Sequence, residues 1–561
     1  MAERSFPLKG ASLLIAGALV LSACSLLPGD NEAPKPKPKP PVSTSLPNTD
    51  WKAASAAKVA QGGDLRLAVP ALPTNFNPQH ADGAMSEAQT ILGPTSGGAV
   101  RVTKDGGWTV DPDYASSVKV TSKNPLTIQV KLNPKAVWQG GAPITSKDMV
   151  AFWKAQNGET NDFEVSSTEG YEDISDIQTD GRYAYDVVFS EPTAEWPNYI
   201  YPHLPANVSK SAKSFNSGFV KKAPSSNGPF LVASIDFNTG TVTEQPNPRW
   251  WGAKPKLSSI VWRVAAPDLQ AKAYSEDGLD AISVDATTFA VARKHGTIQQ
   301  AAGVEWSQLT LNGARGPLKD ADVRRAVARA VDRTKIADTV SGHFGLDGVA
   351  LGSLVYVPGQ RGYADSSSAI AFDIEVAKQL LAKAGYKAGA DGVMVRKGKK
   401  LTLRMPVPMD TPANLERAQA IKSDLENVGI VVKFKNVPAA DFFAKHVVAL
   451  DFDIVTFVWR GSAFPIAEAR SRFNPIDSSQ NFTGVADGDI DDAFDKSAGT
   501  LVDALRFTRI ARLDRRILAE PAMVPLAVAP IVMALRKDLR NYGAAQFEQP
   551  DWTIVGFVSA S

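Results

Sequence analysis

Expected strands and helices alternate in the second half of the chain, and this order restricts the possible folds more than any other pattern in the sequence. Strands are expected over residues 401–405, 430–437 and 452–458, and helices begin at Asp373 and Thr411. Each helix repeats apolar residues at intervals of three and four, the spacing of one buried helical face. Parallel strands need crossover connections, which are right-handed and usually helical. The pattern therefore predicts an α/β unit with a parallel sheet.

The first 300 residues show a different pattern. Residues 64–69 and 126–132 alternate apolar and polar side chains, as strands with one buried face do. Glycine and proline separate such segments, and another helix is expected to begin at Asp320. The chain is therefore expected to form a β-richer lobe and an α/β lobe that enclose a cleft, where ligands usually bind.

The N-terminus has the features of an export signal. Arg4 and Lys9 precede an apolar run of eleven residues, 11–21, which as a helix would reach about 16 Å against a hydrocarbon core of roughly 30 Å. The run is too short to span a bilayer, and small residues before a cut are typical of a secretory signal. Leu-Ser-Ala-Cys, ending at Cys24, resembles the bacterial lipobox, whose cysteine is lipidated. The alternative is that Cys24 is an ordinary residue in a cleaved leader.

A linker is expected after the signal. Residues 34–41 alternate proline with lysine, which favours an extended polyproline II conformation and cannot bury apolar area. Folded structure is expected to begin near Gly62.

The composition excludes several classes of protein. With 44% hydrophobic and 21% charged residues, the body has the composition of an ordinary globular protein. The formal net charge of +2 gives no support for nucleic-acid binding. Because Cys24 is the only cysteine, neither an internal disulfide nor a cysteine-based metal site can form.

Catalytic signatures are missing from the sequence. It contains no G-x-S-x-G, H-E-x-x-H or Walker-type G-x-x-x-x-G-K motif, and its five histidines are scattered without metal-ligand spacing. We therefore expect neither an enzyme nor a protein with a cofactor or a metal site.

A series of segments resembles, in the same order, the extracellular solute-binding proteins of family 5, the oligopeptide, dipeptide and nickel receptors of ABC importers. The segments are residues 62–65, 111–115, 126–128, 138–148, 228–230, 247–251, 320–333 and 373–386. The pattern is similar to an actinobacterial branch that includes mycobacterial lipoproteins linked to phosphatidylinositol mannosides.

The resemblance implies a two-lobed periplasmic-binding-protein-like α/β fold (type II, cluster C) with an extra β-rich subdomain. Four parts are expected: a signal peptide at 1–23, a lipid anchor and linker at 24–61, lobe I at 62–312 plus 501–561 with the subdomain at about 76–225, and lobe II at 313–500.

The resemblance also suggests ligand-binding residues. They are Trp138, Trp459, Arg460, Ser462, Phe464 and Asn481. Family receptors that hold a peptide amino terminus carry W-x-x-D-Y, and here Ser462 stands at the aspartate position after Trp459. A buried ammonium without a counter-charge is costly, which puts ordinary capture of a peptide amino terminus in doubt. Trp138 and Trp459 could instead be core residues, and Arg460 could form an ion pair between the lobes.

The expected function is the capture of an oligopeptide or peptide-like ligand in the interlobe cleft. The protein would then deliver the ligand to the membrane permease and ATPase of an ABC importer, as a monomer held outside the cell membrane by the lipid on Cys24. The alternative is a non-transport lipoprotein of the same fold that acts in phosphatidylinositol mannoside metabolism through a partner protein. A nickel role is not expected, because the histidines do not cluster.

Overall fold

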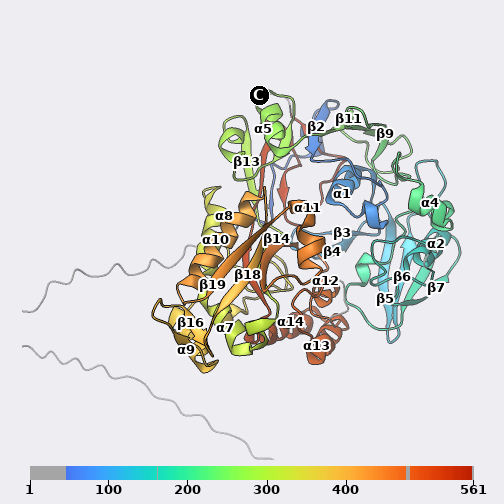
Figure 1. Ribbon diagram of the computed structural model, residues 1–561. Coiled ribbons are helices and arrows are strands. Elements are labelled where there is room, and N and C mark those ends of the chain that lie inside the picture. The colour runs from blue at the N-terminus through green and yellow to red at the C-terminus, as the bar shows by residue number, and fades with distance from the viewer. Residues whose placement is uncertain (1–45, 161, 475–479, 559–561) are drawn as a thin grey trace, which may run out of the picture. The chain divides into compact units, whose positions relative to one another are not determined.

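The computed structural model describes residues 46–160, 162–474 and 480–558 (Figure 1). Residues 45–561 form one compact unit. Cys24 and the alternating proline and lysine residues lie outside the described residues, so the structure does not test the predicted lipidation and linker.

One sheet has the strand order β2-β11-β10-β9, formed by Asp64–Val69, Ser259–Val264, Thr241–Pro246 and Phe230–Asp236. β2 and β11 run parallel, whereas the other pairs are antiparallel. The alternation predicted over 64–69 is confirmed, because Leu65, Leu67 and Val69 are buried. These side chains pack with Trp262 in one apolar core.

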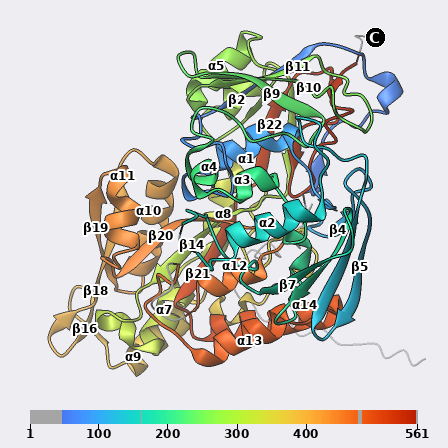
Figure 2. The ribbon, with the colours of Figure 1, turned by 90° about the vertical axis from the view of Figure 1, so that its right-hand side faces the viewer.

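A second, antiparallel sheet has the order β5-β6-β8-β7, formed by Ala115–Lys123, Leu126–Leu132, Ala184–Phe189 and Ile174–Thr179. Helix α2 (Ser146–Gln156) packs against this sheet, and its Phe152 shares a core with Leu126 and Ile128 of β6. Thr145 and Asp148 form a capping box at its start, which satisfies two otherwise free backbone N–H groups. Figure 2 shows α2 and β4 next to the strands of this sheet.

The α/β part contains the predicted parallel pair. β18 (Thr402–Pro408) and β19 (Val431–Val437) are parallel and joined by α10 (Pro412–Glu426). Helices α7 (Ala321–Ala330) and α9 (Ile374–Lys383) begin where Asp320 and Asp373 were expected to cap them, and both carboxylates accept a backbone N–H. The predicted caps are therefore confirmed.

The third predicted parallel strand pairs differently. β20 (Ile454–Arg460) is antiparallel to β14 (Glu305–Leu311), which also pairs with β21 (Met523–Val528). On the other side, the backbone N–H of Asp453 donates to the carbonyl of Arg404 at 3.0 Å. The Asp453 carboxylate accepts the Arg404 N–H at 2.7 Å, so a side chain replaces the next ladder bond between β18 and β20.

Two adjacent segments of the chain, called the passages below, connect the sheet of β20, β14 and β21 to another three-stranded sheet. It runs from β13 (Thr297–Ala301) to β14 through residues 302–304, and from β21 to β22 (Ile531–Leu535) through residues 529–530. β22 lies between β12 (Ala281–Ser283) and β13. Because β13 pairs with β22 and β14 with β21, both passages connect the same two sheets.

The first described residues lie against these passages. β1 (Thr49–Asp50) pairs with β24 (Ala544–Ala545), and the Pro47 carbonyl accepts the Ala302 N–H at 2.9 Å. Regular structure therefore begins at Thr49, earlier than the start near Gly62 that the sequence predicts.

The helices that follow β20 are α12 (Ile466–Ser471), α13 (Gly488–Ala498) and α14 (Asp503–Ala519). Other elements are β3 (Val100–Val102), β4 (Trp108–Val110), α1 (Ser86–Leu92), α3 (Ala206–Ser209), α4 (Ala212–Ser217), α5 (Pro267–Ser275), α6 (Phe289–Ala292), α8 (Arg333–Gly342), α11 (Ala439–Asp441), β15 (Lys387–Ala388), β16 (Met394–Arg396), β17 (Lys399–Lys400), β23 (Leu539–Arg540) and β25 (Gly556–Phe557). Within the described ranges, none of the helices combines the length and hydrophobicity that a bilayer crossing requires.

Candidate functional site

A cavity of about 280 Å³ lies where distant parts of the chain meet. The hairpin of β3 and β4, the segment at 194–196, the loop at 356–361, the segment at 463–466 and the start of α14 contribute to its wall. Its aromatic residues are Trp108, Trp196, Tyr356, Phe464 and Phe507, and its polar ones include Lys123, Glu195, Gln360, Arg361, Asp503 and Arg506. Ligand sites typically combine apolar and aromatic walls with a few fixed polar groups in this way.

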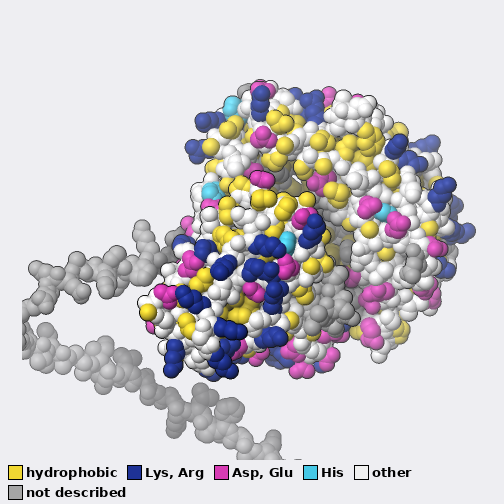
Figure 3. All heavy atoms as spheres, viewed as in Figure 1, with side chains coloured by type: hydrophobic (Ala, Val, Ile, Leu, Met, Phe, Trp, Pro, Cys, Tyr) yellow, Lys and Arg dark blue, Asp and Glu magenta, His cyan; other side chains and the backbone are white. Residues whose placement is uncertain are grey.

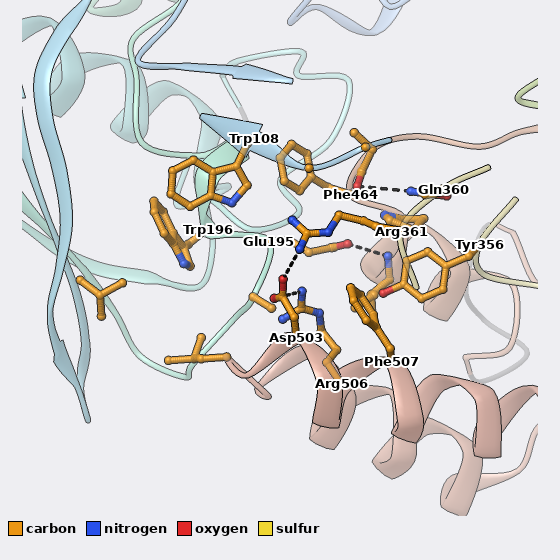
Figure 4. Close-up of a pocket in the computed structure, with 18 of the residues that line it drawn as sticks. Trp108, Glu195, Trp196, Tyr356, Gln360, Arg361, Phe464, Asp503, Arg506 and Phe507 are labelled. Atoms are coloured by element: carbon orange, nitrogen blue, oxygen red, sulfur yellow. Dashed lines mark hydrogen bonds and ion pairs between the residues drawn. The ribbon is translucent and has the colours of Figure 1, made fainter. Parts of the chain in front are cut away.

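Two aromatic pairs form opposite sides of the cavity (Figure 4). Trp108 and Trp196 meet edge to face, with ring centroids 5.0 Å apart. Tyr356 and Phe507 meet in the same geometry at 5.8 Å. Edge-to-face pairs hold rings in a defined orientation, which gives the cavity walls that can contact an apolar group from two sides.

Three charged groups of the wall are paired with one another. Asp503 accepts hydrogen bonds from Arg361 at 2.7 Å and from Arg506 at 2.6 Å. Both guanidinium groups also lie near the Phe507 ring, at 5.9 and 5.2 Å from its centroid. These contacts fix the position of the two arginines and leave Asp503 with little capacity to bind a ligand cation.

Glu195 is the other acid in the wall, and its side chain is buried. Its carboxylate accepts the backbone N–H of Ile466 at 2.6 Å and of Ala467 at 3.0 Å. Burial raises the pKa of Glu195 to about 7, although the two N–H groups act in the opposite direction.

One of the predicted ligand-binding residues lines this cavity, and a second lies beside a residue of the wall. Phe464 lines it. The backbone carbonyl of Ser462 accepts the Gln360 amide at 2.9 Å, and Gln360 is part of the wall. Ser462 also directly precedes Ala463, which lines the cavity.

Trp459 and Arg460 lie farther along β20. The Trp459 ring is half-buried, stacks on Phe482 with 8° between the ring planes, and has the Arg472 guanidinium 4.8 Å from its centroid. Arg460 is exposed and pairs with Glu305 at 3.2 Å on the neighbouring strand β14. Arg460 thus forms an ion pair between adjacent strands of one sheet, and the pair between the lobes stays a prediction.

Trp138 and Asn481 are enclosed by protein. Trp138 belongs to the core of the β-rich part, and its indole N–H has no hydrogen-bond partner. The Asn481 amide donates to the carbonyls of Asn474 and Val485 and accepts from Thr483, so it organises its own loop. Neither residue lines the cavity, and a ligand contact for either stays a prediction.

Aromatic side chains also gather on the surface next to Trp459. The ring of Phe443, which is 49% exposed, contacts Phe457, and Phe457 in turn contacts Trp459, each pair with centroids 5.3 Å apart. Figure 3 shows hydrophobic side chains around the position of α11 and a hollow beside them. Phe457 itself is buried, so the exposed ring of this group is that of Phe443.

The sequence did not single out most of the cavity wall. Trp108, Trp196, Tyr356 and Phe507 carry no motif, and Glu195 precedes a Trp-Pro pair in a loop. No local pattern brings these positions together, because they belong to four separate segments, around Trp108, Glu195 and Trp196, Tyr356, and Phe507.

No group of three or more histidine, cysteine, aspartate or glutamate side chains among the described residues could hold a metal ion.

Comparison with known proteins places these features in a family. Residues 109–493 match the model of the bacterial extracellular solute-binding proteins, family 5 Middle. The oligopeptide-binding proteins OppA of Mycobacterium tuberculosis and Mycobacterium bovis are each 32% identical to the chain over 551 residues, covering 96% of this chain and 92% of the relative. A Mycobacterium tuberculosis protein named a probable monoacyl phosphatidylinositol tetramannoside-binding protein, LpqW, is 24% identical over 456 residues, covering 74% of this chain and 69% of that protein.

Solved structures share the fold. The periplasmic EDTA-binding protein EppA has a TM-score of 0.84 at 24% identity, covering 92% of this chain and all of that one. The oligopeptide-binding protein AppA of Bacillus subtilis, solved with a nonapeptide, has a TM-score of 0.72 at 19% identity, covering 90% of this chain and 100% of that one. The two-lobed α/β fold expected from the sequence is confirmed.

Proposed function

We propose that this chain, which belongs to the bacterial extracellular solute-binding proteins of family 5, captures an oligopeptide or peptide-like ligand between its lobes and passes it to an ABC importer. The observation that carries this proposal is the cavity between the Trp108–Trp196 pair and the Tyr356–Phe507 pair. The name and near-complete coverage of the mycobacterial oligopeptide-binding relatives favour a peptide.

The cavity itself accepts only part of a ligand. Its volume of about 280 Å³ lies just below the roughly 300–1,000 Å³ typical of ligand pockets. One apolar or aromatic side chain fills such a space between the two aromatic pairs. The rest of the ligand therefore lies outside this cavity.

The charges in the wall disfavour a free peptide amino terminus inside the cavity. Ser462 offers no carboxylate, Asp503 is held by two arginines, and Glu195 already accepts two N–H groups. An ammonium that leaves water without a counter-charge incurs a large desolvation cost. The preferred ligand therefore has a blocked or cyclised amino terminus, or keeps its ammonium in solvent.

The remaining parts of the proposal concern the whole protein. Lobe I comprises 62–312 and 501–561 with the β-rich subdomain at about 76–225, and lobe II comprises 313–500. Cys24 carries the lipid that holds the monomer outside the membrane, and two acyl chains at roughly 0.8 kcal/mol per buried methylene suffice for stable anchoring. The protein binds its ligand without changing it, as befits a family of solute-binding proteins.

The test is native mass spectrometry of the full chain, purified in detergent from its own host. The expected result is a co-purified peptide-like mass that is lost in the Trp108→Ala and Phe464→Ala variants. Phe443→Ala is the matched control, because Phe443 lies outside the cavity and its loss should weaken retention less. A ligand-free protein in every preparation, or equal retention by all three variants, would contradict the proposal.

A second candidate function is action in phosphatidylinositol mannoside metabolism, favoured by the relative that is named for binding monoacyl phosphatidylinositol tetramannoside. Its identity and coverage are lower than those of the oligopeptide-binding relatives, which is why we place it second. Detection of a mannosylated lipid in the same mass spectra, in place of a peptide, would reverse the order.

A further inference from the structure

Glu195 connects two parts of the chain that are 271 residues apart in sequence. It lies in the segment between β8 and α3, on the β-rich side, whereas Ile466 and Ala467 begin α12 on the other side. Beside it, the Ala194 N–H donates to the carbonyl of Ala498, the residue that ends α13, at 2.7 Å. Two hydrogen bonds to the Glu195 carboxylate and one backbone–backbone bond therefore join the two parts. Figure 4 shows Glu195 at the cavity wall.

The environment of this carboxylate is poor in compensating charge. Apart from the two N–H groups, the ionisable groups that act on it are Glu169, which disfavours its charge, and Arg506, which favours it. Arg506 is itself paired with Asp503, and the remaining ionisable neighbours, Tyr199 and Tyr356, are buried phenols. Glu195 is only 3% exposed, so water does not stabilise its charge here.

We propose that Glu195 is a latch between the lobes that links their closure to the uptake of a proton. The latch rests on the proposed function, in which the lobes close around a ligand. When the lobes separate, the carboxyl leaves Ile466 and Ala467, enters water and ionises at ordinary acidity. When they close, the carboxyl is buried again, and it takes up a proton if the pH lies below its pKa in the closed form.

The sign of the effect follows from linkage. Burial raises the pKa of Glu195 from 4.5 to about 7 in the closed arrangement, and exposure restores the ordinary value. Closure therefore becomes more favourable as pH falls from about 7 towards 4.5. For a single proton the ratio of closed to open molecules changes by at most about tenfold per pH unit.

The experiment measures closure directly and needs no ligand. The full chain in detergent carries Cys24→Ser together with Asp176→Cys on exposed β7 and Lys433→Cys on exposed β19. Spin labels at these two positions report the distance between the β-rich part and the α/β part at pH 8.0 and pH 5.5. Circular dichroism at both values confirms that each variant is folded.

In the otherwise unchanged protein, we expect the ratio of short to long distances to rise at least about fivefold on going to pH 5.5. Glu195→Gln should abolish this response, because the amide does not titrate. Glu195→Ala should lower the short population at both pH values, since two buried N–H groups then lack an acceptor. Glu191→Gln, an exposed acid four residues earlier, should retain the full response.

A pH response in Glu195→Gln equal to that of the parent would overturn the latch, as would an unchanged distance distribution in Glu195→Ala. Absence of a co-purified ligand from every preparation, with an intact distance response, would refute the proposed function and leave the latch standing. The two failures are therefore distinguishable.

Discussion

The carbonyl oxygen of Ala529 occupies the space that a Cβ on Gly303 would need, at 1.6 Å from that position. Gly303 lies on the passage from β13 to β14 and Ala529 on the passage from β21 to β22. The two connections between the sheets thus pack backbone against backbone. Glycine is the residue that allows such a close approach.

Gly303→Ala should therefore destabilise the protein, because a backbone atom cannot move aside as a flexible side chain can. We expect a loss of about 1–3 kcal/mol in the free energy of unfolding, measured by urea denaturation. Gly140→Ala is the matched control, since a Cβ there meets no atom within 4 Å. Equal stability of the two variants would show that the passages separate without cost.

Arg472 should matter far more for stability than Arg460. The Arg472 guanidinium is buried between the rings of Trp306 and Trp459, at 5.3 and 4.8 Å from their centroids, and is paired with Glu468. Lysine cannot reproduce a planar, stacked guanidinium, so Arg472→Lys should cost about 2–4 kcal/mol. The exposed pair of Arg460 with Glu305 predicts a loss below about 1 kcal/mol for Arg460→Lys. Thermal unfolding of both variants measures these losses of stability. Similar losses in Arg472→Lys and Arg460→Lys would contradict the prediction.

Asp514 should make stability depend on pH. Its buried carboxylate accepts hydrogen bonds from the Ser353 hydroxyl at 2.6 Å and the Leu354 N–H at 2.9 Å, yet burial raises its pKa to about 7. The folded state therefore keeps a proton that the unfolded state releases near pH 4, and the free energy of unfolding falls as pH rises from about 4 to 7.

Asp514→Asn removes this contribution. The slope, at most about 1.4 kcal/mol per pH unit for one group, should become shallower in urea titrations between pH 4 and 8. Glu195 contributes a slope of the same sign, so Glu195→Gln combined with Asp514→Asn should flatten the profile further. An unchanged slope in Asp514→Asn would show that this carboxyl titrates alike in both states.

Ser462→Asp tests the reasoning about peptide termini. The new carboxylate stands next to the cavity residue Ala463 and supplies the counter-charge that the wall lacks. Affinity for an alanine tetrapeptide with a free amino terminus should rise at least about tenfold by calorimetry, whereas the N-acetylated peptide should gain nothing. A change below about threefold would mean that another acid already serves the ammonium.

Periodicity predicted most of the α/β part. β18, α10 and β19 form where the spacing of apolar residues predicted them. Each element buries one face, and its apolar residues repeat with the period of that face. The partner of β20 was not predictable in this way, since pairing with β14 joins segments about 150 residues apart. The hydrogen bond from the Arg404 N–H to the Asp453 side chain likewise could not be predicted from local sequence.

The candidate site was predictable only through motif resemblance, which led to Phe464 and its neighbour Ser462. Trp108, Glu195 and Tyr356 meet only after three separate segments have packed, and none of them has a distinctive local sequence. Trp138 was singled out because it opens a family motif, but a motif residue can be retained for the core it builds.

The attachment of the first described residues to the passage at Ala302 has a mechanical consequence. Pro47 is hydrogen-bonded to Ala302, and Asp50 accepts the Gln300 N–H at 2.7 Å, so the first described residues are held at the connections between the two sheets. A pull transmitted from the N-terminal side would therefore reach these connections before it reached the rest of either sheet.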